Sequence, residues 1–251
     1  IAIVTFSSVP SVTSADLTLA ELRQILRADL VACRQSTLSL LDHLTDRELR
    51  QQAHPDFSPI GWHLGHIAFT ESLWLLENLK QDPCAYPQYR RLFAADGLPK
   101  AERENLPALP ALLTFLQDIR DRTLTYLETA PLYDQLRLWR WILQHESQHA
   151  ETATYVLALH RRSATALSPM PQASSPSRSV HPEGRSATAP MVFIPGGSFE
   201  MGSDSVDALD NERPCHEVTV ADFWLDGTPV TVDDYRGFLE RGGYQQPQWW
   251  D

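Results

Sequence analysis

Residues 16–160 are predicted to be largely helical. From Leu17 to Leu44 the apolar positions are mostly three and four residues apart, with Thr37 interrupting the row, which is the period of an amphipathic helix. The first row of such positions comprises Leu19, Leu22, Leu26, Leu30, Cys33, Leu40, Leu41 and Leu44. Ser58 and Pro59 are typical of a helix start, and the helix that they predict ends near Lys80. Two more helices are expected at residues 110–128 and 132–161. Four helices with one long connection predict a four-helix bundle, which we assign to residues 16–162.

The pattern changes twice after the predicted bundle. Residues 163–190 are rich in Ala, Ser and Pro, which is typical of a linker that has no core of its own. From residue 191 apolar and polar positions alternate, which predicts two short strands around a Pro-Gly-Gly turn and further strands beyond it. A helix ending at Gly242 and Gly243 follows. Residues 191–251 therefore predict the start of a second, α+β domain, which we expect to continue past Asp251 because about 60 residues bury too little surface for a secure fold.

The charge and amino-acid composition argue against several classes of protein. The formal net charge of -11 disfavours binding to nucleic acid, because such binding needs Lys and Arg to replace the counterions of the phosphates. Cys33, Cys84 and Cys215 are too widely spaced for a disulfide framework, which indicates free thiols in the reducing cytoplasm. No apolar run reaches the roughly 18 residues of a membrane span. We therefore expect a cytoplasmic protein with neither a nucleic-acid nor a membrane partner, and the sequence leaves the oligomeric state open.

Candidate chemistry begins with a histidine pair in the fourth predicted helix. His145 and His149 are four residues apart, so they project from the same helix face, together with Ile142 and Val156. That face is apolar and should look into the bundle, where two imidazoles are costly to bury unless something satisfies them. A metal ion does so, since neutral imidazole is a common ligand of zinc, iron, copper and nickel. The pair therefore predicts a metal site in the bundle core.

The second predicted helix offers a third ligand in the string WHLGH of residues 62–66. At about 100° per residue, His66 shares a face with Trp62 and Phe69, whereas His63 lies on a more mixed face. The more apolar face should be the buried one, so we predict that His66 is the ligand and that His63 is a surface residue or supports the site from outside the ligand shell. Three histidines leave the opposite side of an octahedral metal open, but their spacing alone does not separate iron from zinc or nickel.

Residues 145–149 read HESQH, and this is also the HExxH pattern of zinc proteases, in which Glu146 would be the general base. We give this alternative less weight, because such proteases need a third ligand downstream, whereas here the helix runs into a Ser/Pro-rich stretch. Gln148 lies about 60° around the helix from the His145 row. It is a candidate to contact the substrate or a metal-bound water, and the alternative is an ordinary polar residue of the helix.

Two blocks of the sequence resemble a known enzyme family. Residues 57–77, FSPIGWHLGHIAFTESLWLLE, and residues 141–151, WILQHESQHAE, resemble the DinB-like helical domain of the ergothioneine-type sulfoxide synthases. Residues 191–203, MVFIPGGSFEMGS, and the stretch from residue 210 to residue 244 resemble the opening of a formylglycine-generating-enzyme-like domain, whose fold is related to C-type lectins. In this order the two blocks cover most of residues 16–251, and the combination is specific for that family.

The resemblance implies a non-haem iron(II) enzyme that uses O₂ to join the sulfur of a cysteine-type thiol to an imidazole carbon, giving a sulfoxide. It implies hercynine (Nα-trimethylhistidine) or histidine as one substrate, and γ-glutamylcysteine or cysteine as the other. His66, His145 and His149 match the three iron ligands of the family, and Gln148 matches its glutamine beside the last ligand. Candidates to bind the carboxylates of the thiol substrate are Arg90 and Arg91.

Part of the implied site falls outside these residues. The catalytic residues, including the tyrosine of the family, are expected beyond Asp251, so we expect no turnover from these 251 residues alone even with iron bound. A DinB-like metal-dependent thiol transferase or hydrolase is the alternative function, and a selenium-inserting relative of the synthases stays open as well.

Overall fold

A computed structural model describes residues 17–42, 44–166 and 191–250. The chain divides into two compact units. The first contains the long helices together with the short segment Ser205–Leu209, and the second contains the strands and the last helix. Of the linker predicted at residues 163–190, residues 167–190 lie outside the described part of the chain, and residues 163–166 continue the last long helix.

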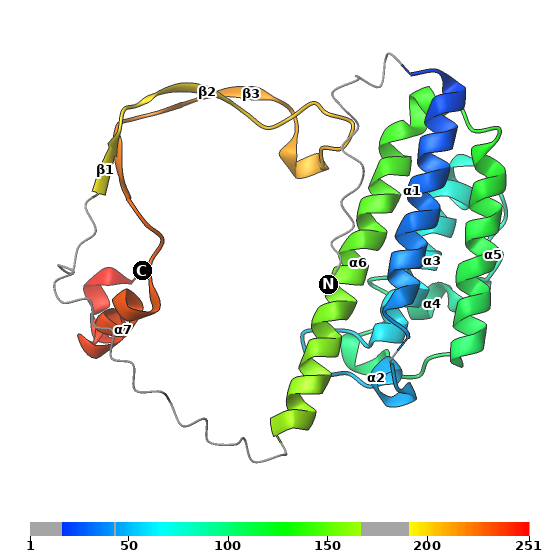
Figure 1. The fold of residues 1–251 in the computed structure, drawn as a ribbon, viewed down its shortest axis with the longest axis horizontal. Helices are drawn as coiled ribbons and strands as arrows, with labels where there is room; N and C mark the ends of the chain where they lie inside the picture. Colours follow the sequence, from blue (N-terminus) through cyan, green and yellow to red (C-terminus); the bar gives the residue numbers. More distant parts are fainter. Residues whose placement is uncertain (1–16, 43, 167–190, 251) are drawn as a thin grey trace. The chain divides into compact units, whose positions relative to one another are not determined.

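The first unit is built on four long helices that lie side by side (Figure 1), which confirms the predicted bundle. These helices are α1 (Leu19–Ser39), α3 (Ile60–Glu71), α5 (Leu109–Leu127) and α6 (Leu132–Ala166). Helix α1 packs along α6, and α3 packs against both α5 and α6. The connections carry two further short helices, α2 (Asp46–Arg50) and α4 (Arg90–Phe93), and single 3₁₀ turns at Pro87–Tyr89 and Lys100–Glu102.

Helix α1 shows how the apolar row becomes the core. Thr18 caps its first turn, because the Thr18 hydroxyl accepts from the Glu21 N–H while the Glu21 carboxylate accepts from the Thr18 N–H. The predicted positions from Leu22 to Leu30 are then buried against the other helices. The helix ends at Ser39, so the last part of the predicted row lies in the turn that follows it.

Helix α3 lies at the centre of the bundle and changes its winding at its end. All 12 of its residues are buried, so the expectation of one buried face and one mixed face was wrong for this helix. It continues without a break into a π-helical segment, η1 (Ser72–Leu79), after which the Lys80 N–H still bonds to the Leu75 carbonyl, five residues back, over 3.1 Å. π-helical turns are rare in proteins, and those that occur often lie at functional sites.

Four charged side chains, one from each long helix, are buried together in the bundle, and we call them the ion cluster. They are Arg34, Glu71, Arg120 and Glu146, and each is at most 5% exposed. Arg34 donates to Glu146 over 2.7 Å and to Glu71 over 2.9 Å. Arg120 donates to both Glu71 oxygens over 2.9 Å and to Glu146 over 2.5 Å. Each guanidinium also donates to a main-chain carbonyl of the neighbouring helix, so the ion cluster ties α1, α3, α5 and α6 together.

The ion cluster is electrically neutral and well hydrogen-bonded, which are the conditions under which buried charges are tolerated. Burial alone would raise the pKa of Glu146, but the two guanidinium groups outweigh that effect and hold this pKa at about 2. The carboxylate is therefore ionised throughout the ordinary pH range. Its negative charge pairs with Arg34 of α1 and Arg120 of α5.

The second unit contains a long two-stranded ribbon and a helix (Figure 1). The strands are β1 (Met191–Ile194), β2 (Gly197–Met201), β3 (His216–Val220) and β4 (Phe223–Asp226), and the helix is α7 (Val232–Glu240). The two strands predicted around the Pro-Gly-Gly stretch are present, but they do not pair with each other. Instead β1 pairs with β4 and β2 with β3, and the register runs on from one pair to the next, so both pairs are successive parts of one ribbon.

Helix α7 begins and ends at residues typical of helix boundaries. Thr231 and Asp234 form a capping box at its start, and Gly242, with a φ of 68°, takes the left-handed conformation just after its end, as the Gly242-Gly243 signal predicted. The helical first part followed by a sheet-containing region confirms the predicted fold class.

In the described residues, no helix is both long and apolar enough to cross a membrane.

The ion cluster generates a stability prediction. Replacing Arg120 by Met leaves the two buried carboxylates to share the single guanidinium of Arg34, with one negative charge uncompensated, so Arg120→Met should lower the free energy of unfolding by about 3–5 kcal/mol. The matched control is Arg122→Met on the same helix, which removes a half-exposed ion pair with Asp118 and should cost about 0–1 kcal/mol. Urea unfolding followed by circular dichroism measures both, and equal losses in the two variants would contradict the role of the ion cluster.

Candidate metal centre

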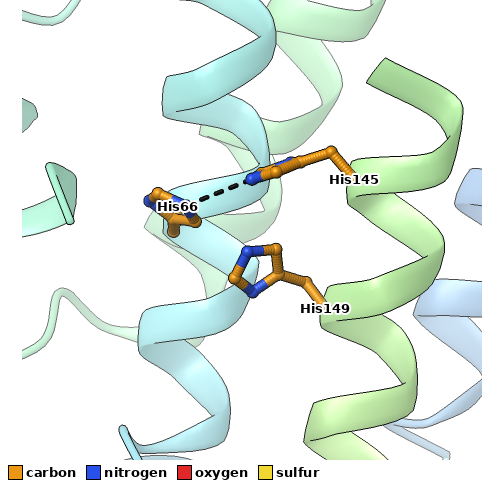
Figure 2. Close-up of side chains that lie close together, drawn as sticks. All are labelled: His66, His145 and His149. Carbon is orange, nitrogen blue, oxygen red and sulfur yellow. Dashed lines mark hydrogen bonds between the residues drawn. The ribbon is translucent and has the colours of Figure 1, made fainter. Parts of the chain in front are cut away.

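Three histidines converge inside the bundle, His66 from α3 and His145 and His149 from α6 (Figure 2). The Nε2 atoms of His66 and His145 are 3.2 Å apart, and one ring nitrogen from each of the three residues lies within 4.8 Å of the others. Two ligands at about 2.1 Å from one ion lie about 3.0 Å apart at an octahedral angle and about 3.4 Å apart at a tetrahedral angle. The three side chains, called the triad below, are therefore spaced to hold one ion, and no other cluster of three potential ligands is found among the described residues.

The orientation of His66 is fixed by the short helix α4. The His66 Nδ1–H donates to the Phe93 carbonyl over 2.7 Å, and since a carbonyl can only accept, the proton is on Nδ1 and the Nε2 lone pair faces His145. Trp62, one turn earlier, stacks on the His66 ring at 4.7 Å and donates from its indole to the Leu92 carbonyl over 2.7 Å. Two consecutive carbonyls of α4 therefore hold two consecutive turns of α3.

This close approach explains the glycine beside His66. A Cβ on Gly65 would lie 2.1 Å from the Phe93 ring, which no side chain tolerates. Phe93 is itself fully buried, so it has no space into which to retreat. Gly65 thus makes room for α4, the element that orients His66.

His149 is held by a fourth histidine. The Nδ1 atoms of His63 and His149 are 2.9 Å apart, which leaves the Nε2 of His149 for the triad. His63 is 6% exposed, so the alternative that it lies on the surface is wrong. The face argument from the sequence failed for His63 because α3 is buried on every side.

The triad is electrically neutral. Burial, together with the neighbouring imidazoles, lowers the pKa of His145 to about 3 and that of His149 to about 4, and burial also lowers the pKa of His66. Neutral imidazoles carry the lone pairs that a metal ion needs. The donor set of three such rings, without a carboxylate, suits iron, zinc or nickel.

The other candidate residues lie in different surroundings. Glu146 belongs to the ion cluster, and an ionised carboxylate held by two guanidinium groups is unsuited to act as the general base of the HExxH alternative. Gln148 lies on the exposed side of α6 beside His149. Arg90 is ion-paired with Glu77 of the π-helical segment, and Arg91 is exposed. Among the described residues, no contact joins either arginine to the triad.

Sequence reasoning missed the supports of the triad rather than its members. Any residue could supply the Phe93 carbonyl, so nothing in the sequence marks it. Trp62 was detectable, because it lies one turn before His66 on the same face. An aromatic pair beside the triad was missed as well: the Trp141 ring lies 5.2 Å from that of His145, and the partly exposed Trp74 lies 6.1 Å from Trp141.

Comparison with known proteins finds relatives of both parts of the chain. The DinB superfamily matches residues 29–153, and the sulfatase-modifying factor enzyme 1-like domain matches residues 176–251. A protein of Mycolicibacterium smegmatis named hercynine oxygenase is 35% identical over 236 residues, which are 91% of this chain and 53% of that protein. The hercynine oxygenase of Mycobacterium tuberculosis is 35% identical over 90% of this chain and 52% of its own length.

A further relative matches the second part alone. The inactive C-alpha-formylglycine-generating enzyme 2 of Bos taurus is 47% identical over 62 residues, which are 25% of this chain and 21% of that protein. The chain spans about half the length of the hercynine oxygenases that it matches. Those matches run through both parts of the chain.

The lowered histidine pKa values generate a prediction for the metal-free protein. Each triad histidine has a lower pKa folded than its ordinary value of 6.5, so between pH 6.5 and about 4 the unfolded chain binds more protons and stability rises with pH. The free energy of unfolding should therefore fall as the pH drops through this range. His145→Asn should reduce the slope of the unfolding free energy against pH by the amount that corresponds to about one bound proton. Urea unfolding at several pH values measures it, and an unchanged slope in His145→Asn would contradict a buried neutral imidazole.

Proposed function

Because the chain belongs to the DinB superfamily through residues 29–153 and to the sulfatase-modifying factor enzyme 1-like domain family through residues 176–251, we propose that it is part of an iron(II)- and O₂-dependent enzyme. The reaction joins the sulfur of a cysteine-type thiol to an imidazole carbon of hercynine. One O₂ is consumed: a C–S and an S–O bond form, the S–H and C–H bonds break, and the second oxygen atom leaves as water with both hydrogens.

The observation that carries this proposal is the convergence of the buried His66 and the half-buried His145 and His149 in a neutral cluster. Their spacing and protonation suit one divalent ion, and their resemblance to the ligands of the sulfoxide synthases favours iron. When bound, iron(II) would activate O₂, which takes its four electrons from the thiol and the imidazole substrate, and would bring the two substrates together. The same three histidines would also suit a zinc-dependent thiol transferase, which needs no O₂ chemistry and is the second candidate function.

The second part of the chain favours the synthase over the transferase. A bundle transferase has no need for the sulfatase-modifying factor enzyme 1-like domain, whereas the relatives named hercynine oxygenase match the chain through both parts. Hercynine as the imidazole substrate follows from the name of these relatives. The thiol would be γ-glutamylcysteine or cysteine.

Within the described residues, the roles divide by helix. Helices α3 and α6 would present His66, His145 and His149 to the ion from one side and so leave its other side to the substrates. Since all three ligands are neutral, the ion would keep its full positive charge and attract a thiolate. Gln148, exposed beside His149, would orient the imidazole substrate without binding the metal.

The two arginines would have unequal parts in substrate binding. Arg90 is committed to Glu77, so a substrate carboxylate would have to compete with that ion pair. Arg91 is exposed on the same short helix and is the better placed of the two to meet a carboxylate. Both residues lie on α4, whose Phe93 carbonyl orients His66, so α4 would link thiol binding to the ligand shell.

The metal site is tested on the chain itself. Loaded anaerobically with iron(II) and desalted, the chain should retain about one iron per molecule, because three preoriented imidazoles bind a single ion. His149→Ala should abolish stoichiometric iron, and His160→Ala, on the same helix but outside the triad, should not. Iron retained at full stoichiometry by His149→Ala would show that the triad is not the site.

The role of Gln148 is tested in the full natural protein that carries this chain. Gln148→Ala should lower turnover of hercynine with a cysteine-type thiol by about 10–100-fold, the usual effect of losing a group that supports a metal site, while iron content stays unchanged. Mass spectrometry of the sulfoxide product and metal analysis measure the two quantities. Loss of iron in this variant would mean that Gln148 is a ligand instead.

A further inference from the structure

His63 lies beside the triad, and the proposed reaction gives it no task. It is buried in α3, its ring lies 5.1 Å from that of His149, and its edge meets Trp62 at 5.4 Å. Its Nδ1 is 2.9 Å from the Nδ1 of His149. Its Nε2 is buried and makes no hydrogen bond of standard geometry.

The short distance between the two Nδ1 atoms requires one proton between them. If His63 carried that proton, the Nδ1 lone pair of His149 would accept it, the neutral His149 ring would be protonated on Nε2, and that nitrogen could not bind a metal. If His149 carries it, the Nε2 of His149 is a lone pair facing the triad. Only the second arrangement is compatible with His149 as a ligand through Nε2.

The second arrangement also sets the state of His63. To accept from His149, the Nδ1 of His63 must be unprotonated, so the neutral ring carries its proton on Nε2. The buried nitrogen that makes no hydrogen bond of standard geometry is then the protonated Nε2 of His63.

We propose that His63 is a positioning residue of the metal centre, which accepts the His149 Nδ1–H and thereby holds His149 in the tautomer and ring orientation that ligate through Nε2. This rests on the proposed metal site. Metal-bound histidines usually donate their second N–H to a carboxylate, a carbonyl or water. His66 follows this rule with the Phe93 carbonyl, and His149 uses a neutral imidazole instead.

The first test compares metal affinity in matched variants. His63→Leu removes the acceptor and keeps the apolar bulk, and His63→Asn keeps an acceptor oxygen near the position of Nδ1. Competition with a chromogenic chelator should show cobalt(II) binding weakened about 10–100-fold in His63→Leu and largely preserved in His63→Asn. His160→Leu, on α6 but bonded to the Gln51 carbonyl, controls for loss of any histidine and should leave the affinity unchanged.

The second test reads the tautomers directly and needs no variant to fold. In the zinc-loaded wild-type chain with ¹⁵N-labelled histidine, long-range proton–nitrogen spectra should show His63 protonated on Nε2 only and His149 protonated on Nδ1. A proton on the Nδ1 of His63 would overturn the proposal, as would an unchanged cobalt(II) affinity in a folded His63→Leu. If either result is found but His149→Ala loses the ion, only the role of His63 is wrong and the metal site is supported. If His149→Ala retains the ion, the metal site itself is wrong.

Discussion

The arrangement of the bundle depends on four charges that must stay paired. Each carboxylate of the ion cluster bonds to both guanidinium groups, and the four residues come from four different helices. A buried charge that loses its partner is strongly destabilising, so a sliding movement of one helix would break several bonds at once. Glu146 directly follows His145, and Glu71 lies five residues after His66. The same bonds therefore fix the relative register of α3 and α6, which the 3.2 Å separation of the two imidazoles requires.

The helical part of the fold and the triad could be predicted because their signals are local. The recurring apolar positions indicate the long helices, and the four-residue spacing of His145 and His149 places them on one face whatever the partner helix is. The ion cluster could not be predicted, since Arg34 and Glu71 are residue types that are mostly exposed, and only the packing of four helices shows that they meet. His63 was undecided for a related reason: a face argument needs a solvent-exposed face for comparison, and α3 has none. Strand pairing in the second unit was missed because the Pro195-Gly196 stretch interrupts a ribbon instead of reversing it.

Helix α4 shows how a short, unpredictable element can decide the geometry of a site. Its consecutive carbonyls bond to Trp62 and His66, and its Phe93 ring fills the space that Gly65 leaves open. These contacts lie four residues apart on α3, so together they fix both the position of α4 and the rotation of the His66 ring. The exposed Arg91 is carried by the same helix. If Arg91 binds substrate and His66 binds metal as proposed, α4 would connect the two rigidly, which is what oriented catalysis demands.

The bundle buries its polar groups in two separate ways, and the contrast bears on the proposed chemistry. The ion cluster is satisfied by itself: its charges cancel and its hydrogen bonds are made within the protein. The histidine cluster carries no charge, and none of its three candidate ligands is a carboxylate. A divalent ion placed among carboxylates would have part of its charge neutralised by the protein, whereas among neutral imidazoles it keeps that charge for whatever binds on its open side. In the proposed reaction this separation would serve thiolate binding at the metal, because the carboxylates of the ion cluster are paired with arginines and are not among the three candidate ligands.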